Sequence, residues 1–163
     1  MTTIARLTLP AQLDNFDQNA KVWVYQSSRP FTEQESALIQ NALRDFAMQW
    51  TAHNQQLKAA GLLLLNRIIV LVVDETQAGA SGCSIDTSVH FIQSLEKSYN
   101  VQLFDRMIVN YMQGDTWMST TVPEISALSA DVVVFDPLVA NLGALRNQAV
   151  NALSNTWMAS FLN

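Results

Sequence analysis

The first hundred residues show two spacings of hydrophobic residues, one typical of strands and one typical of helices. Within 21–26, Val22 and Val24 alternate with Trp23 and Tyr25, so both faces of this segment are apolar. Alternation with a period of two is the pattern of a strand, and a strand that is apolar on both faces is expected to be buried. The sequence therefore predicts a buried strand at 21–26.

The segment that follows has the pattern of an amphipathic helix. Thr32 and Glu35 have the spacing of a capping box, in which each side chain accepts a hydrogen bond from the other residue's backbone N–H. Asn54 is the expected end of the helix, because asparagine tolerates the left-handed backbone that closes many helices. One face of the helix carries residues at three-to-four spacing, namely Ile39, Ala42, Leu43, Phe46, Trp50 and His53.

Two strands and a second helix are predicted next. The segments 62–65 and 68–73 have strand patterns and are joined at 66–67 by a tight turn or bulge. Because 68–73 is uniformly apolar and rich in β-branched residues, we expect it to be a central strand covered on both faces. A helix over about 84–99 is expected to carry apolar side chains on one side and polar side chains on the other.

The remaining segments complete an α+β fold. They predict a hairpin from 106–112 and 117–122, a short strand at 132–135, and helices in two pieces from about residue 142 to the C-terminus. This order favours a two-layer α/β sandwich with a mixed or antiparallel sheet, a ferredoxin-like βαββα start and extra C-terminal helices. We expect a single domain over 1–163, with 1–20 loosely ordered.

The low content of charged residues points to a covered surface. Hydrophobic residues make up 49% of the chain and charged residues only 14%, against about 25% in a typical soluble chain. Because so few charges cannot interrupt every apolar patch, we expect a partner to cover part of the surface. A second copy of the chain is the first expectation, which predicts a homo-oligomer such as a homodimer.

Charge and motif spacing weigh against several classes of function. The net charge is -5 and the nine basic residues are scattered, which disfavours nucleic-acid binding. The longest apolar run, 59–73, is interrupted and too short to span a membrane. No Gly-x-x-x-x-Gly-Lys-Ser/Thr loop and no zinc-like His/Cys spacing occurs, so we expect no P-loop ATPase, no metal site and no cofactor. The lone cysteine and the absence of a signal-like start favour the cytoplasm.

The junction between the predicted central strand and the second helix, 73–86, is the strongest candidate site. The amides around Ser84 lie at a helix N-terminus, which favours anions and lowers the pKa of a thiol. Cys83 is then either a nucleophile or a small buried residue that fills the junction. Asp86 and His90, at i and i+4, can contact one another, but Cys83 and His90 lie about 10 Å apart along a helix. Asp86 and His90 are alternatively a first-turn carboxylate and a solvated histidine.

Other candidates follow from their positions at the ends of elements. His53 is an acid-base candidate, or a histidine packed in the last turn of the first helix. Asp74 ends the central strand, where functional carboxylates are common, but aspartate also forms turns there. Arg29 and Arg106 each have the charge to bind an anion, or to form a surface ion pair.

Four segments of the first half of the chain carry a resemblance to known sequences. They are Val-Trp-Val-Tyr-Gln-Ser-Ser-Arg-Pro-Phe-Thr-Glu-Gln-Glu at 22–35, Gln-Trp-Thr-Ala-His at 49–53, Ile-Val-Leu-Val-Val-Asp-Glu at 69–75 and Ala-Ser-Gly-Cys-Ser-Ile-Asp at 80–86. These segments resemble a family of small, uncharacterised bacterial proteins that often carry the label "ABC transporter ATPase". An ATPase of that class needs a phosphate-binding loop, which this sequence lacks, so the resemblance implies candidate positions and no ATPase activity. Those positions are Cys83, Asp86, Asp74, His53 and Arg106. The resemblance covers about 22–112.

Together these observations predict a cytoplasmic binding or interaction protein that self-associates. The alternative is a small enzyme, or a protein that binds an anion or small ligand, with the thiol of the 74–86 junction at its site. The catalytic candidates are Cys83, Asp86, His53 and Asp74. The ligand-binding candidates are Ser84, Arg29, Arg106 and His90.

Overall fold

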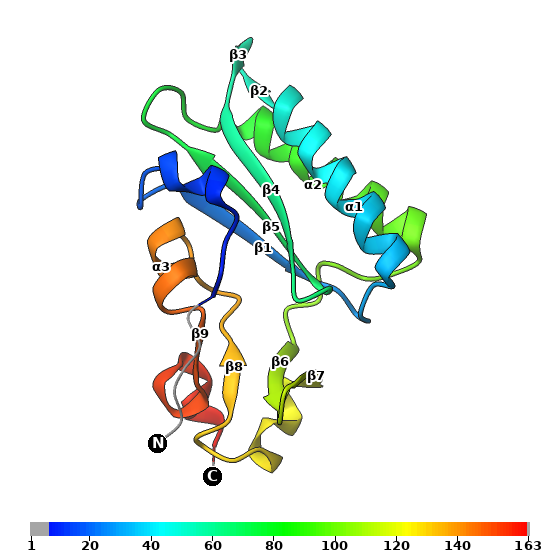
Figure 1. Ribbon diagram of the computed structural model, residues 1–163, viewed down its shortest axis with the longest axis vertical. Coiled ribbons are helices and arrows are strands. Elements are labelled where there is room, and N and C mark those ends of the chain that lie inside the picture. Colours follow the sequence, from blue (N-terminus) through cyan, green and yellow to red (C-terminus); the bar gives the residue numbers. More distant parts are fainter. Residues whose placement is uncertain (1–6, 163) are drawn as a thin grey trace.

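The predicted α+β class is confirmed by a computed structural model that describes residues 7–162 (Figure 1). The helices are α1 (Glu33–Gln49), α2 (Gly82–Tyr99) and α3 (Leu142–Asn147). The strands are β1 (Lys21–Gln26), β2 (Thr51–Ala52), β3 (Gln55–Gln56), β4 (Lys58–Leu64), β5 (Ile68–Asp74), β6 (Ile108–Gln113), β7 (Thr116–Thr121), β8 (Val133–Phe135) and β9 (Val150–Ala152).

The first sheet has the order β1-β5-β4, and α1 and α2 cover one of its faces (Figure 1). Strand β5 lies in the middle and is buried along its whole length, which confirms the central position predicted for 68–73. Its side chains alternate between two cores. Those that face the helices are Ile69, Leu71 and Val73, and those that face the C-terminal part of the chain are Ile68, Val70 and Val72.

A second sheet, in the order β7-β6-β8-β9, lies beyond the end of the first (Figure 1). Strand β6 follows α2 in the chain but pairs with β7 and β8, so it does not return to the first sheet. The short β2–β3 hairpin is separate from both sheets. Every strand pair among residues 7–162 is antiparallel, so of the mixed and antiparallel alternatives only the second is observed.

A buried polar network fixes the second sheet against the first. The side chain of Gln26, at the end of β1, donates to the carbonyl oxygen of Ile108 at 2.9 Å and accepts from Asn110 Nδ2 at 2.7 Å. Arg67, in the β4–β5 turn, donates to Ser119 Oγ at 2.9 Å. Burial lowers the pKa of Arg67, which has no carboxylate partner among residues 7–162. The network joins β1 and the β4–β5 turn to β6 and β7.

The prediction that the first helix continues to Asn54 is wrong. The helix begins as predicted, with both hydrogen bonds of the Thr32–Glu35 capping box, but it ends at Gln49. Trp50 is buried and its indole N–H donates to the carbonyl oxygen of Ser84 at 2.8 Å, which turns the chain toward α2. His53 and Asn54 then form the turn of the β2–β3 hairpin, both with left-handed backbone.

The C-terminal end of the chain also differs from expectation. The C-terminal part was predicted to be helical in two pieces, but α3 is followed by strand β9 and then by short 3₁₀ turns at 153–155 and 157–161. Of the segment 1–20, predicted to be loosely ordered, residues 1–6 lie outside the described residues. Within 7–20, Leu13 and Ala20 are buried in the core. No helix in residues 7–162 has the length and apolar character needed to cross a membrane.

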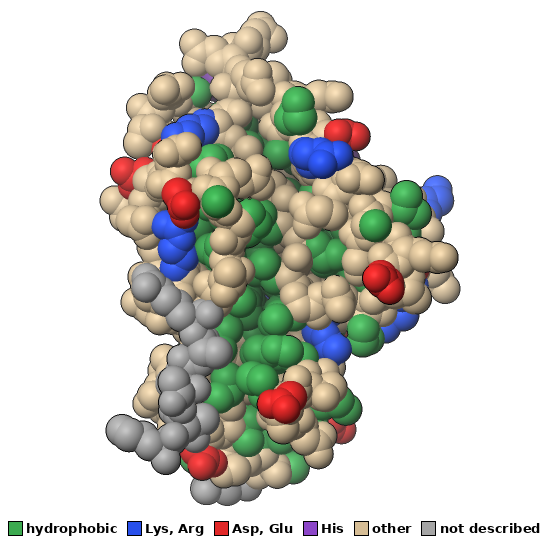
Figure 2. Space-filling model, viewed as in Figure 1, with side chains coloured by type: hydrophobic (Ala, Val, Ile, Leu, Met, Phe, Trp, Pro, Cys, Tyr) green, Lys and Arg blue, Asp and Glu red, His purple; other side chains and the backbone are tan. Residues whose placement is uncertain are grey.

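The surface reflects the low content of charge. On the face drawn in Figure 2, hydrophobic side chains gather in a band along the middle of the molecule, and Lys and Arg side chains are scattered around it. The exposed large hydrophobic residues of the described chain are Leu38, Met48, Phe104, Met107, Met118, Leu138, Trp157 and Phe161.

Candidate functional site

Strand β1 has one paired edge and one open edge. In an antiparallel pair, the backbone groups of alternate residues point to opposite edges of the strand. The N–H of Ser27 donates to the carbonyl oxygen of Arg67 on the β5 side, and the N–H of Val22 donates to Ala140 on the other side. Val24 therefore points its N–H and C=O away from β5, and neither group has a hydrogen-bond partner among residues 7–162.

The open edge is short because other segments close both of its ends. At the start of β1, Val22 N–H donates to the carbonyl oxygen of Ala140 at 3.1 Å, and Leu142 N–H donates to that of Ala20 at 2.9 Å. Just after β1, Ser28 N–H donates to the carbonyl oxygen of Gln102 at 3.0 Å. The open stretch, from the Val22 carbonyl to residue 26, is roughly 13 Å long at ~3.3 Å per residue.

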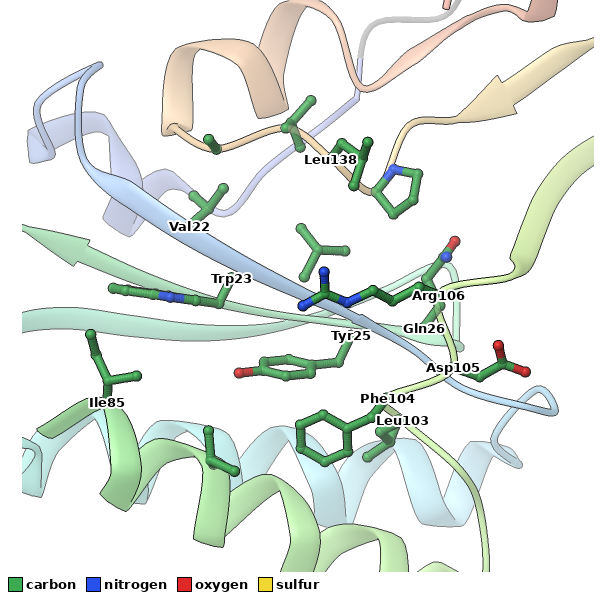
Figure 3. Close-up of a pocket in the computed structure, with 15 residues that line it drawn as sticks. Val22, Trp23, Tyr25, Gln26, Ile85, Leu103, Phe104, Asp105, Arg106 and Leu138 are labelled. Carbon is green, nitrogen blue, oxygen red and sulfur yellow. The ribbon is translucent and has the colours of Figure 1, made fainter. Parts of the chain in front are cut away.

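Apolar side chains form walls on both sides of this edge, around a pocket of about 430 Å³ (Figure 3). On the helix side, the Tyr25 and Phe104 rings meet edge to face with 5.4 Å between their centroids. On the other side, Leu138 belongs to the loop between β8 and α3. Phe104 and Leu138, which are 40% and 59% exposed, flank the pocket from opposite sides of β1. Both walls are therefore apolar and accessible. Ile85 and Val89 from α2, with Pro137 and Val139, extend them.

Arg106 brings a positive charge to this groove. Its side chain reaches from the loop before β6 toward the middle of the pocket, whereas the side chain of Asp105 points the other way (Figure 3). The Asp105 carboxylate accepts the N–H of Met107 at 2.9 Å, and no acidic residue among 7–162 forms an ion pair with Arg106. Burial raises the pKa of Tyr25, against a smaller opposing effect of its hydrogen bond with Ser88, so this phenol stays neutral. We call this site the β1 groove.

The predicted residues of α2 lie outside the β1 groove. Of the two alternatives for Cys83, the small buried residue is wrong, because Cys83 is exposed on the first turn of α2. Asp86 and His90 are exposed too, and no hydrogen bond joins them in the described chain. Ser84 is buried as part of the helix cap, where its hydroxyl donates to the carbonyl oxygen of Ser81 at 2.8 Å.

Asp74 has a structural environment. Its Oδ1 accepts from the Thr76 N–H and hydroxyl at 3.0 and 2.7 Å. Its Oδ2 accepts from Asp17 N–H at 3.0 Å and lies 3.3 Å from Lys58 Nζ. Burial of the carboxyl opposes ionisation, but these hydrogen bonds together hold the pKa of Asp74 well below its usual range. The carboxylate is thereby committed to holding three chain segments together.

Arg29 and His53 are also separated from the groove. Arg29 forms a double hydrogen bond with Glu35, at 2.8 and 2.9 Å, and donates to the carbonyl oxygen of Tyr99 at 2.8 Å. The hydrogen bonds that Glu35 accepts from Arg29 and from the backbone N–H of Thr32 lower the pKa of Glu35 to about 2. Arg29 therefore joins the start of α1 to the end of α2. His53 is exposed in the β2–β3 turn.

Of the predicted site residues, the structure places only Arg106 at the β1 groove. It does not assemble Cys83, Asp86, His53 and Asp74 into one pocket, and residues 7–162 contain no cluster of three metal-ligating side chains. Sequence reasoning missed Phe104 and Leu138, since an exposed hydrophobic residue in a loop has no recognisable pattern. The signal that was available is the apolar character of both faces of 21–26.

No family model, no curated protein and no solved structure matches this chain. The chemistry of the β1 groove is therefore the basis for assigning a function.

Proposed function

We propose that this protein is a binding protein that takes an extended segment of a partner polypeptide into the β1 groove. The observation that carries the proposal is the open edge of β1, where the N–H and C=O of Val24 have no hydrogen-bond partner among residues 7–162 and lie between two apolar walls. Extended peptides bind such edges by adding a strand: the backbone hydrogen bonds supply affinity, and side-chain pockets supply specificity.

The arrangement of the first sheet supports the same proposal. We propose that this sheet, with the order β1-β5-β4 and with α1 and α2 on one face, is the ferredoxin-like start expected from the sequence. A ferredoxin-like fold would place the strand after α2 antiparallel against β1, but here that strand is β6, which pairs elsewhere. We propose that a partner strand occupies this position and runs antiparallel to β1.

Two variants of Val24 provide the test. Val24→Pro removes the outward N–H and fills its place with a ring, while the β1–β5 hydrogen bonds remain, because Val24 does not take part in them. Val24→Ala shortens the same side chain but keeps the N–H. Both variants and the wild type are exposed to a phage-displayed library of random octapeptides. We expect enrichment on wild type and Val24→Ala, and at least about tenfold weaker binding of the enriched peptides to Val24→Pro.

The amide resonance of Val24 provides a direct readout of the site. Addition of an enriched peptide should shift the Val24 resonance and slow its hydrogen exchange, because a new hydrogen bond forms there. Equal binding of peptides to Val24→Pro and Val24→Ala, with circular dichroism showing both folded, contradicts the proposal.

Self-association remains a second part of the proposal, supported by exposed aromatic surface. Trp157 and Phe161 are 38% and 48% exposed and meet edge to face with 6.2 Å between their centroids. Such a pair is a suitable contact for a second copy. Light scattering over a wide range of concentrations checks it: a dimer that Trp157→Ser weakens supports the contact, and a monomer at every concentration removes it.

The thiol alternative rests on the exposure of Cys83 alone. No acidic or basic side chain among residues 7–162 forms a hydrogen bond with its sulfur. We therefore place the binding function first.

A further inference from the structure

We infer that the segment bound in the β1 groove carries an acidic side chain between apolar ones, and that Arg106 selects it. This inference rests on the peptide-binding function proposed above and names the chemistry of its partner.

The first argument is the charge of Arg106, which forms no ion pair with residues 7–162. Its guanidinium reaches into the groove, and Asp105, the adjacent carboxylate, points away and binds the backbone of the same loop (Figure 3). By contrast, Arg29 is paired with Glu35, and Arg146 lies 3.8 Å from Asp14. Arg106 thus presents five N–H donors with no carboxylate partner among residues 7–162.

The second argument is the character of the surrounding groove. Phe104, Leu138 and their neighbours are apolar, and the side chain of Gln26 is committed to Ile108 and Asn110. Arg106 is exposed at the groove, so a peptide carboxylate that enters between these walls has it as its cationic partner. Arginine pairs with carboxylates through two parallel hydrogen bonds, and the pair is stronger where water is excluded.

The third argument concerns a second copy of this chain. Each β1 edge lies between walls that carry Phe104 and Leu138. For two β1 strands to pair, their backbones must approach to about 4.8 Å, which would bring the walls of one copy against the walls of the other. The geometry thus favours a single extended segment from another protein, with apolar side chains toward both walls.

The test is a charge exchange. The random octapeptide library is selected on wild type, on Arg106→Glu and on Arg44→Glu. Arg44 is exposed on α1, does not line the groove, and gives the same change in net charge. We expect wild type and Arg44→Glu to enrich peptides with Asp or Glu between apolar residues, and Arg106→Glu to enrich peptides with Lys or Arg. In a synthetic enriched peptide, Glu→Gln should weaken binding to wild type about tenfold and leave binding to Arg106→Glu unchanged or improved.

The possible failures are distinguishable. Peptides that bind wild type, lose binding to Val24→Pro and show no preference for acidic residues overturn the role of Arg106 and leave the proposed function standing. No enrichment on wild type beyond that on Val24→Pro overturns both. A wild-type dimer that Val24→Pro converts into a monomer identifies a second copy as the occupant and also overturns the inference.

Discussion

Replacing Asp74 by asparagine should destabilise the protein far more than the same change at its neighbour Glu75. The amide nitrogen of Asp74→Asn would replace Oδ2, which now accepts the N–H of Asp17 and contacts Lys58. A hydrogen bond to a charged group contributes about 1.5–3 kcal/mol, and a buried donor left unpaired adds to the loss. Because Lys58 is about one third exposed, the Lys58–Asp74 ion pair contributes less to the unfolding free energy than a fully buried pair would. We expect a loss of about 2–4 kcal/mol.

Glu75→Gln is the matched control. Glu75 forms an ion pair with Lys21 at 3.1 Å, in which the lysine side chain is 57% exposed, and its other oxygen accepts the N–H of Ala80. A surface ion pair contributes about 1 kcal/mol or less, and the amide oxygen of glutamine can still accept from Ala80. Urea unfolding at pH 7 should therefore separate the two variants by at least about 1 kcal/mol.

The pH dependence provides an independent check. The pKa of Asp74 is lowered on folding, so its carboxylate stabilises the protein above the unfolded pKa of about 3.9. The stabilisation by the Asp74 carboxylate is lost as the pH falls below the unfolded pKa and then through the lower pKa of the folded protein. The difference in unfolding free energy between wild type and Asp74→Asn should thus be constant above about pH 5 and shrink below pH 4. Equal stabilities of Asp74→Asn and Glu75→Gln at pH 7, or a difference that persists unchanged in acid, would refute the reasoning.

Three further predictions concern local features. Hydrogen exchange should be fast at the Val24 amide and slow at the Trp23 amide, because Trp23 N–H points to β5; equal protection would contradict the open edge. Gly61→Ala should cost about 1–3 kcal/mol, measured by denaturant unfolding, because the added carbon would lie 2.9 Å from Leu43 Cβ and 3.0 Å from its carbonyl oxygen; unchanged stability would mean that α1 does not pack so closely on β4. Cys83 should react with iodoacetamide in the native protein at a rate within about tenfold of the denatured protein, and a requirement for denaturant would contradict its exposure.

Local signals in the sequence predict the elements of this fold well. The capping box of Thr32 and Glu35 is formed, because both hydrogen bonds lie within one helical turn. The uniformly apolar 68–73 segment is the central strand, since burial on both faces requires apolar side chains throughout. The hairpin around Gly114 is observed between β6 and β7, where this glycine has a positive φ of 63°. Each of these depends on residues that are close in sequence.

Features that depend on distant contacts are not predictable in the same way. The first helix ends early because Trp50 bonds to Ser84, a contact that no local pattern encodes. Asn54 does adopt the left-handed backbone expected of it, but in the turn of a hairpin. The chemical type of a residue was also a poor guide: Asp74 proved to be a buried anchor, and Cys83 an exposed residue of α2.

The β1 groove shows why the candidate site was the hardest part. Alternation along 21–26 reports which faces of the strand are covered, but says nothing about which edge is paired. The open edge arises because β6 pairs with β7 and β8, and its walls come from loops that pass Phe104 and Leu138. Among the residues of the groove, only Arg106 could be chosen from the sequence, because it is a cationic residue near the end of an element.

The closed ends of the β1 edge also bear on how the protein avoids aggregation. A long, flat, unpaired strand is a template for other strands, and sheets that grow in this way lead to insoluble fibres. Here the backbone bonds to Ala140 and Gln102 limit the open stretch, and the walls with Phe104 and Leu138 flank it on both sides. A chain with only 14% charged residues has few charges with which to repel its copies. We expect the shape of the β1 groove to protect the open edge from other strands. Widening the groove by deleting part of a loop is therefore expected to reduce solubility before it changes the fold.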